Sequence, residues 1–116
     1  MSVHIKRVYE PPAKEDGFRV LIDHLWPRGM KKEAVAVDEW LKAVAPSTAL
    51  RKWFSHDPEK WEEFKRRYFL ELDENREAVE ELAKKSKSET VTLVFSSKEE
   101  RFNNAVALKE YLETRV

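Results

Sequence analysis

The chain has 116 residues, of which 38% are charged, yet its 22 basic and 22 acidic side chains cancel to zero net charge. This length predicts one domain, residues 1–116, with its own core. The absence of cysteine excludes thiol catalysis, disulfides and cysteine-based zinc sites. Without a basic excess, nucleic acid is disfavoured as a partner. No stretch matches a membrane span or a signal peptide, so we expect a cytoplasmic protein, and the charge-rich, glutamine-free composition is typical of thermophiles.

Three segments have the pattern of β-strands. Residues 3–8 alternate apolar and polar side chains, which predicts a strand with one buried face. Residues 18–23 begin with a largely apolar run and predict a central strand buried on both faces. Residues 90–95 (Thr-Val-Thr-Leu-Val-Phe) are the clearest strand of the chain.

Helices are predicted between and after these strands, over residues 38–44, 48–54, 58–86 and 98–113. Asp38 is the expected cap of the first. The run Asp57-Pro58-Glu59 is a strong helix start, although the pattern leaves open whether 58–86 is one helix or two. Ser97 and Glu100 have the spacing of a capping box for the last helix.

Strands separated by helices predict the α/β class: a single small domain with a short, mostly parallel sheet and helices on both faces. Folds of this class bind ligands where the strands end. We therefore expect a cleft at the carboxyl ends of the second and last strands. The stretch from Val20 to Gly29 leads from a buried strand into this edge through a carboxylate, an imidazole, an indole and a guanidinium.

Asp23 and Arg28 are the first candidates for this cleft. Arg28 would bind a carboxylate or phosphate, while Asp23 would orient it or act as a base. The alternative is an internal salt bridge between the two side chains that pins the loop. His24 follows Asp23 directly and would point to the opposite face of a strand.

Trp26 and Lys98 are weaker candidates. Trp26 could form one wall of the cleft and stack on a planar ligand, but core packing explains an indole at this position better. Lys98 stands between the last strand and the last helix, where it would add positive charge for an anion. The neighbouring Glu99 and Glu100 oppose that role.

Asn103 and Asn104 complete the candidate set. Asn104 shares a helix face with Leu108 and Tyr111, so its amide should point toward the sheet and needs polar partners there. Those partners are either loop backbone groups or a ligand, and tethering of the loop is the favoured interpretation.

Catalysis and metal binding have little support in the sequence. The run Ser96-Ser97-Lys98 has the residue types of a serine–lysine pair, but no nucleophile, base and orienting group can be assembled. The three histidines are far apart and do not have metal-ligand spacing, so neither a metal nor a cofactor is expected. Basic runs such as Arg51-Lys52 and Lys65-Arg66-Arg67 are interpreted as solvated helix faces.

Several long runs are unusual in combination: Val20-Leu-Ile-Asp-His-Leu-Trp-Pro-Arg-Gly29, Trp40-Leu-Lys, Ala45-Pro-Ser-Thr-Ala-Leu-Arg-Lys-Trp-Phe54, His56-Asp-Pro-Glu-Lys-Trp61 and Asn103-Asn-Ala-Val-Ala-Leu-Lys-Glu-Tyr-Leu112. Together they resemble the YeaO-like branch of the family catalogued as domain of unknown function 488. The resemblance extends from residue 3 to residue 113. It implies a small cytoplasmic α/β protein and implies no particular activity.

Other branches of that family carry cysteine, and a Cys-His-Arg cluster, near the last strand and helix. The matching positions here are Phe95, Asn103, Asn104 and Ala105, so no thiol or cysteine–metal mechanism carries over. The YeaO-like branch commonly has a histidine just before the asparagine pair, where this chain has Phe102.

Two hypotheses of function follow. The first is binding of, or action on, a small anionic metabolite such as a nucleotide, by Asp23, Trp26, Arg28, Lys98, Asn103 and Asn104. The second is a non-enzymatic interaction module, acting as a homo-oligomer or with nucleic acid through its helix faces. Whether the protein is an enzyme, and whether it self-associates, stays open at this point.

Overall fold

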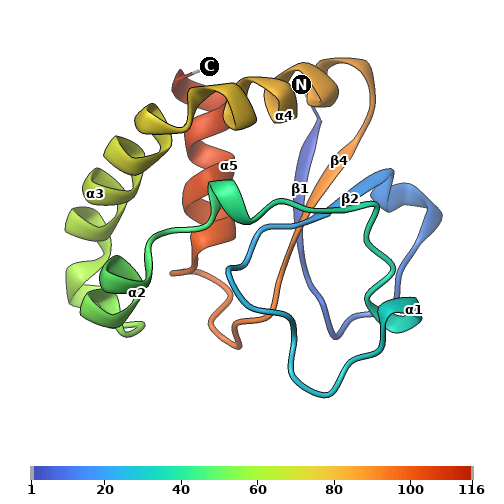
Figure 1. Ribbon diagram of the computed structural model, residues 1–116, viewed down its shortest axis with the longest axis horizontal. Helices are drawn as coiled ribbons and strands as arrows, with labels where there is room; N and C mark the ends of the chain where they lie inside the picture. The colour runs from blue at the N-terminus through green and yellow to red at the C-terminus, as the bar shows by residue number, and fades with distance from the viewer. Residues whose placement is uncertain (1, 116) are drawn as a thin grey trace.

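The sheet is the centre of the molecule. The computed structural model describes residues 2–115, and in them four parallel strands lie in the spatial order β1-β4-β2-β3 (Figure 1): β1 (Val3–Arg7), β2 (Phe18–Leu21), β3 (Glu39–Trp40) and β4 (Val91–Phe95). In the register of β4, Leu93 faces Ile5 on one side and Val20 on the other. Every residue of β4 is buried, as expected for a parallel strand with a neighbour on each edge.

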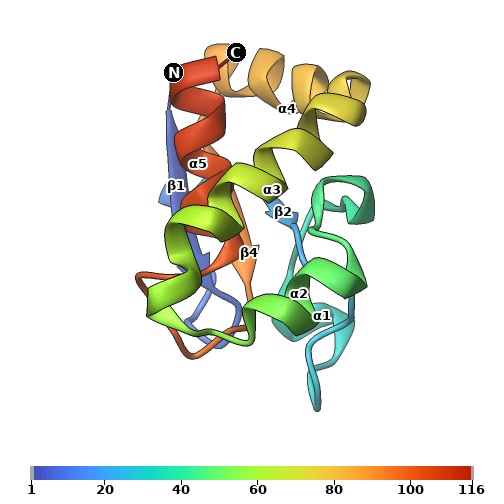
Figure 2. The ribbon, with the colours of Figure 1, turned by 90° about the vertical axis from the view of Figure 1, so that its left-hand side faces the viewer.

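The two faces of the sheet are covered unequally. One face packs against four helices, with α3 and α5 in front of the strands in Figure 2: α2 (Thr48–Phe54), α3 (Trp61–Glu74), α4 (Arg76–Ser88) and α5 (Asn104–Arg115). The other face is covered by the single turn of α1 (Lys32–Val35) and by the loop after β2, whose Trp26 and Met30 pack on Leu21 and Val94. The α/β class and the parallel sheet are thus confirmed. No helix between residues 2 and 115 has the length and apolar character needed to cross a membrane.

A buried ion-pair network holds the second cover layer in place. Arg19, in β2, is only 4% exposed. Its guanidinium donates to the carboxylate of Asp16 at 2.6 Å and to the backbone carbonyls of Val35 and Ala36 at 2.8 and 2.9 Å. Lys6 donates to the same carboxylate at 3.0 Å. The buried guanidinium therefore fixes α1 and its following turn against the sheet.

The prediction of a helix over residues 38–44 is wrong. The structure has β3 at Glu39–Trp40 and a 3₁₀ turn at Lys42–Val44. Asp38 does not cap a helix; its carboxylate accepts a hydrogen bond from the backbone N–H of Arg19 at 2.9 Å, and its own N–H donates to the carbonyl of Arg19. These contacts with β2 extend the chain and add an edge strand.

The last helix begins later than expected, at Asn104, and the capping box of Ser97 with Glu100 does not form. The hydroxyl of Ser97 instead accepts from the N–H of Glu99, and the carboxylate of Glu99 accepts from two further N–H groups, so this segment forms a turn. The helix over residues 48–54 is confirmed, with Ser47 as its cap. The segment 58–86 contains two α-helices, separated at Asn75.

Candidate functional site

Asp23 joins three elements at the carboxyl edge of the sheet. One of its carboxylate oxygens accepts from both the N–H and the hydroxyl of Ser96, which follows β4, at 2.8 and 2.7 Å. The other accepts from the amide of Asn104, the first residue of α5, at 3.1 Å. The Asn104 amide also donates to the carbonyl of Ile22 at 3.3 Å. The neighbouring parallel strands β2 and β4 bring these groups together because both end at this edge.

These contacts change the role expected for Asp23. A carboxylate that accepts three hydrogen bonds from the protein has little capacity left to act as a base. The charge of Asp23 also adds to the effect of burial in raising the pKa of the Tyr68 hydroxyl well above its usual value. Asp23 therefore connects the ends of β2 and β4. The Asn104 amide ties α5 to the end of β2 through the Ile22 carbonyl and the Asp23 carboxylate, in place of the loop backbone groups that were expected as its partners.

A cleft of about 500 Å³ opens beside this junction. It is lined by residues that follow β1, β2 and β4 and by residues at α2 and α5: Tyr9, Asp23, His24, Leu25, Trp26, Pro27, Arg28, Arg51, His56, Ser96, Ser97 and Asn104. Four of the six predicted site residues lie on it: Asp23, Trp26, Arg28 and Asn104. The structure therefore brings together most of the candidate set around a single cavity.

The cations of the cleft lack carboxylate partners. Within residues 2–115, neither Arg28 nor Arg51 forms an ion pair, so the salt bridge considered between Asp23 and Arg28 is absent there. The Nε atom of Arg51 is buried and has no hydrogen-bond partner in this part of the chain. Such an orphaned donor is costly and marks a place where a partner can bind.

Trp26 contributes to both the cleft and the core. Its indole N–H donates to the carbonyl of Met30 at 2.8 Å, and its ring meets that of Trp40 edge-to-face with centroids 5.4 Å apart. The indole of Trp40 in turn donates to the carbonyl of Asp23 at 2.7 Å. Packing therefore fixes the position of the Trp26 ring, and part of its surface lines the cleft.

Two predicted site residues lie outside this cleft. Asn103 is 2% exposed; its amide donates to the carbonyl of Glu99, and its oxygen accepts from the N–H of Val106, so it caps α5. Lys98 lines an adjoining cavity of about 450 Å³ with His56, Ser97 and Glu99.

The prediction missed Arg51 and His56. The pair Arg51-Lys52 was interpreted as part of a solvated helix face. In α2, however, Arg51 directly follows the buried Leu50 and lies one turn before the buried Phe54, which places it on the border of the inner face. His56 directly follows the helix end and reaches the same cleft. The spacing of the apolar residues Leu50 and Phe54 in this short helix was therefore the signal in the sequence that could have placed Arg51 near the inner face.

The basic run on α3 is neutralised within the protein. Lys65 pairs with Glu62 and Glu110, whereas Arg66 and Arg67 share the carboxylate of Glu63. These pairs weaken the case for this helix face as a nucleic-acid surface, because its charges already have partners.

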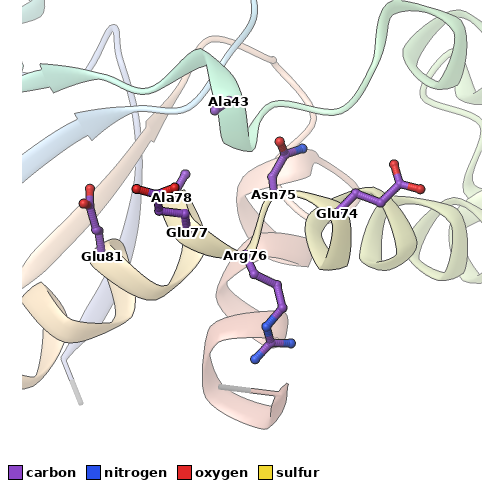
Figure 3. Close-up of a pocket in the computed structure, with 7 residues that line it drawn as sticks. All are labelled: Ala43, Glu74, Asn75, Arg76, Glu77, Ala78 and Glu81. Atoms are coloured by element: carbon purple, nitrogen blue, oxygen red, sulfur yellow. The ribbon is translucent and has the colours of Figure 1, made fainter.

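A different cavity, of about 390 Å³, lies where α3 meets α4, opposite Ala43 (Figure 3). Its charged lining is mostly acidic, with Glu74, Glu77 and Glu81 along the two helices. That charge disfavours an anion. No group of three side chains able to hold a metal occurs in the described part of the chain.

Comparison with known proteins confirms the resemblance to the DUF488 family. A family model described as "Inactive DUF488-N3 subclade" matches residues 2–116. The chain belongs to this subclade of the DUF488 family. It is similar to the "Uncharacterized protein YeaO" of Escherichia coli strain K12, with 40% identity over 114 residues that cover 98% of this chain and 99% of the relative. It is equally similar to the "Uncharacterized protein Rv3073c" of Mycobacterium tuberculosis, with 40% identity over 97% of this chain and 95% of the relative. No solved structure matches the chain.

Proposed function

We propose that this protein binds a small anionic metabolite with a planar group, such as a nucleotide, in the cleft beside Asp23. The observation that carries the proposal is the pair of guanidinium groups, Arg28 and Arg51, that line one cavity without a carboxylate partner in residues 2–115. Arginine binds phosphate and carboxylate groups with two parallel hydrogen bonds, and both of these residues line the cleft.

The mouth of the cleft suits a planar group. Tyr9 is 46% exposed and Leu25 is 63% exposed, and both line the cavity. The hydroxyl of Tyr9 donates to the carbonyl of Arg28 at 3.3 Å, which ties the aromatic ring to the cationic loop. An exposed aromatic beside a cation site is the combination that a base and its phosphate require.

Binding without chemistry is the form of the proposal that the observations support best. The carboxylate of Asp23 is occupied by Ser96 and Asn104, the chain contains no cysteine, and the matching family model is described as inactive. A cleft with cations but without a reactive group can still hold a ligand.

The test is thermal unfolding of the purified protein with and without millimolar adenosine monophosphate. A ligand at a hundred times its Kd stabilises the folded state by about 2.7 kcal/mol, so the midpoint should rise clearly. The rise in the unfolding midpoint should disappear in Arg28→Ala and in Arg51→Met. It should persist in the control Arg76→Ala, at an exposed position of α4. If neither adenosine monophosphate nor inorganic phosphate raises the midpoint of the unaltered protein, the proposal is wrong.

A further inference from the structure

A second cavity adjoins the main cleft. The 450 Å³ cavity beside Lys98 shares two lining residues, His56 and Ser97, with the cleft that Arg28 and Arg51 line. We infer that the two cavities form one groove for a ligand with two linked phosphate groups, as in a nucleoside diphosphate. Arg28 and Arg51 hold one phosphate and Lys98 the other. This inference rests on the proposed function and specifies its ligand.

The backbone at the shared wall supports the inference. Ser55 has φ +45° and His56 has φ +56°, so two successive residues other than glycine adopt the left-handed conformation. Ser55 ends α2, where this conformation is common. His56 is the second central residue of a tight turn, in which the N–H of Asp57 donates to the carbonyl of Phe54 at 3.0 Å, and such turns need positive φ at both central residues. The turn holds the imidazole on the wall that both cavities share.

The charges of the second cavity fit a phosphate. Lys98 is exposed and has no carboxylate within salt-bridge distance in the described part of the chain. The one acidic residue of this cavity, Glu99, turns its carboxylate to the N–H groups of Arg101 and Phe102, each at 3.2 Å. Those hydrogen bonds offset part of its repulsion of an anion, so the ammonium group of Lys98 supplies the available charge.

The experiment compares ligands with one and two phosphates by isothermal titration calorimetry. We expect adenosine diphosphate to bind about tenfold more tightly than adenosine monophosphate, because it gains one charge-assisted contact. In Lys98→Ala this preference should disappear, while the affinity for the monophosphate stays within about twofold. Inorganic pyrophosphate and phosphate, compared in the same way, show whether the preference requires the base. Lys14→Ala, an exposed lysine before β2, is the matched control and should keep the preference.

The outcomes separate the two levels of the argument. Equal affinities for the two nucleotides, or equal losses of both in Lys98→Ala, overturn the second phosphate position and leave the main cleft as a site for one anion. Absence of binding by either nucleotide overturns the proposed function and this inference together. Circular dichroism of Lys98→Ala confirms that the variant is folded before affinities are compared.

Discussion

Arg19 and Arg51 differ in whether the nitrogens of their guanidinium groups have hydrogen-bond partners within the protein. Arg19 lies within β2, and its donors reach the carboxylate of Asp16 and two backbone carbonyls. Arg51 lies on α2 beyond the carboxyl edge of the sheet, and its buried Nε has no partner in residues 2–115. An arginine whose three guanidinium nitrogens all have partners holds the fold together. An arginine on the wall of a cavity, without a carboxylate partner, can bind an anion.

The same contrast separates Asp16, which pairs with Arg19, from Asp23, which lines the cleft with Arg51. Asp16 is the shared ion-pair partner of Lys6 and Arg19 on the side of the sheet that α1 covers. Asp23 accepts its hydrogen bonds from uncharged donors of Ser96 and Asn104, so its negative charge stays in the cleft without an ion pair to either arginine. One region therefore contains a closed ion-pair network, and the other contains positive charge open to a ligand.

The largest expected effect comes from breaking the closed network. Arg19→Met removes one of the two cationic partners of a buried carboxylate and leaves the carbonyls of Val35 and Ala36 without this donor. We expect the free energy of unfolding to fall by about 3 kcal/mol. Urea unfolding followed by circular dichroism measures this change. A loss below about 1 kcal/mol would mean that water replaces Arg19 and that the network does not secure α1.

The sequence was informative wherever local patterns determine structure. The buried strand β4 and the helix over residues 48–54 follow from apolar runs and from the cap of Ser47. The edge that carries the cleft follows from the topology of parallel strands. Asp23 was predicted because it follows a buried strand at the edge where such folds bind ligands. Asn104 was predicted because an amide that points toward the sheet needs polar partners.

Pairing between distant segments could not be predicted in the same way. The two residues of β3 form a strand because Asp38 bonds to the backbone of Arg19, a contact across 19 positions. Arg51 joins the cleft only because the fold places α2 beside the loop that follows β2. Arg19, by contrast, had a readable signal: a charged side chain inside a strand expected to be buried on both faces requires a buried partner.

Acid should weaken the closed network. Burial alone would raise the pKa of Asp16, but hydrogen bonds from Ala13, Lys6 and Arg19 outweigh it, and the pKa is lowered from 3.8. A carboxyl group whose pKa is lower in the folded than in the unfolded state stabilises the protein fully at pH values above its unfolded-state pKa. This stabilisation is lost as the pH falls through the folded-state pKa. We therefore expect the stability to decrease below about pH 4.

Unfolding midpoints in urea between neutral pH and acid measure this decrease. Asp16→Asn should be less stable at neutral pH and should lose less stability in acid, because its side chain does not titrate. Equal slopes for the two proteins would show that other carboxylates dominate the acid response and that Asp16 contributes little.

The smallest expected effect on stability is that of Arg51→Met, and it tests the contrast between Arg51 and Arg19. Arg51→Met replaces a guanidinium with an orphaned donor by an unbranched apolar side chain, so little favourable contact is lost. We expect the free energy of unfolding to stay within about 0.5 kcal/mol of the unaltered protein, or to rise slightly. Lys52→Met, at the exposed neighbouring position, controls for the added apolar surface. A loss as large as that of Arg19→Met would make Arg51 a structural residue and remove the main support for an anion in the cleft. An unchanged stability, together with lost protection by adenosine monophosphate, would show that the protein keeps this charge for a ligand, since the fold does not need it.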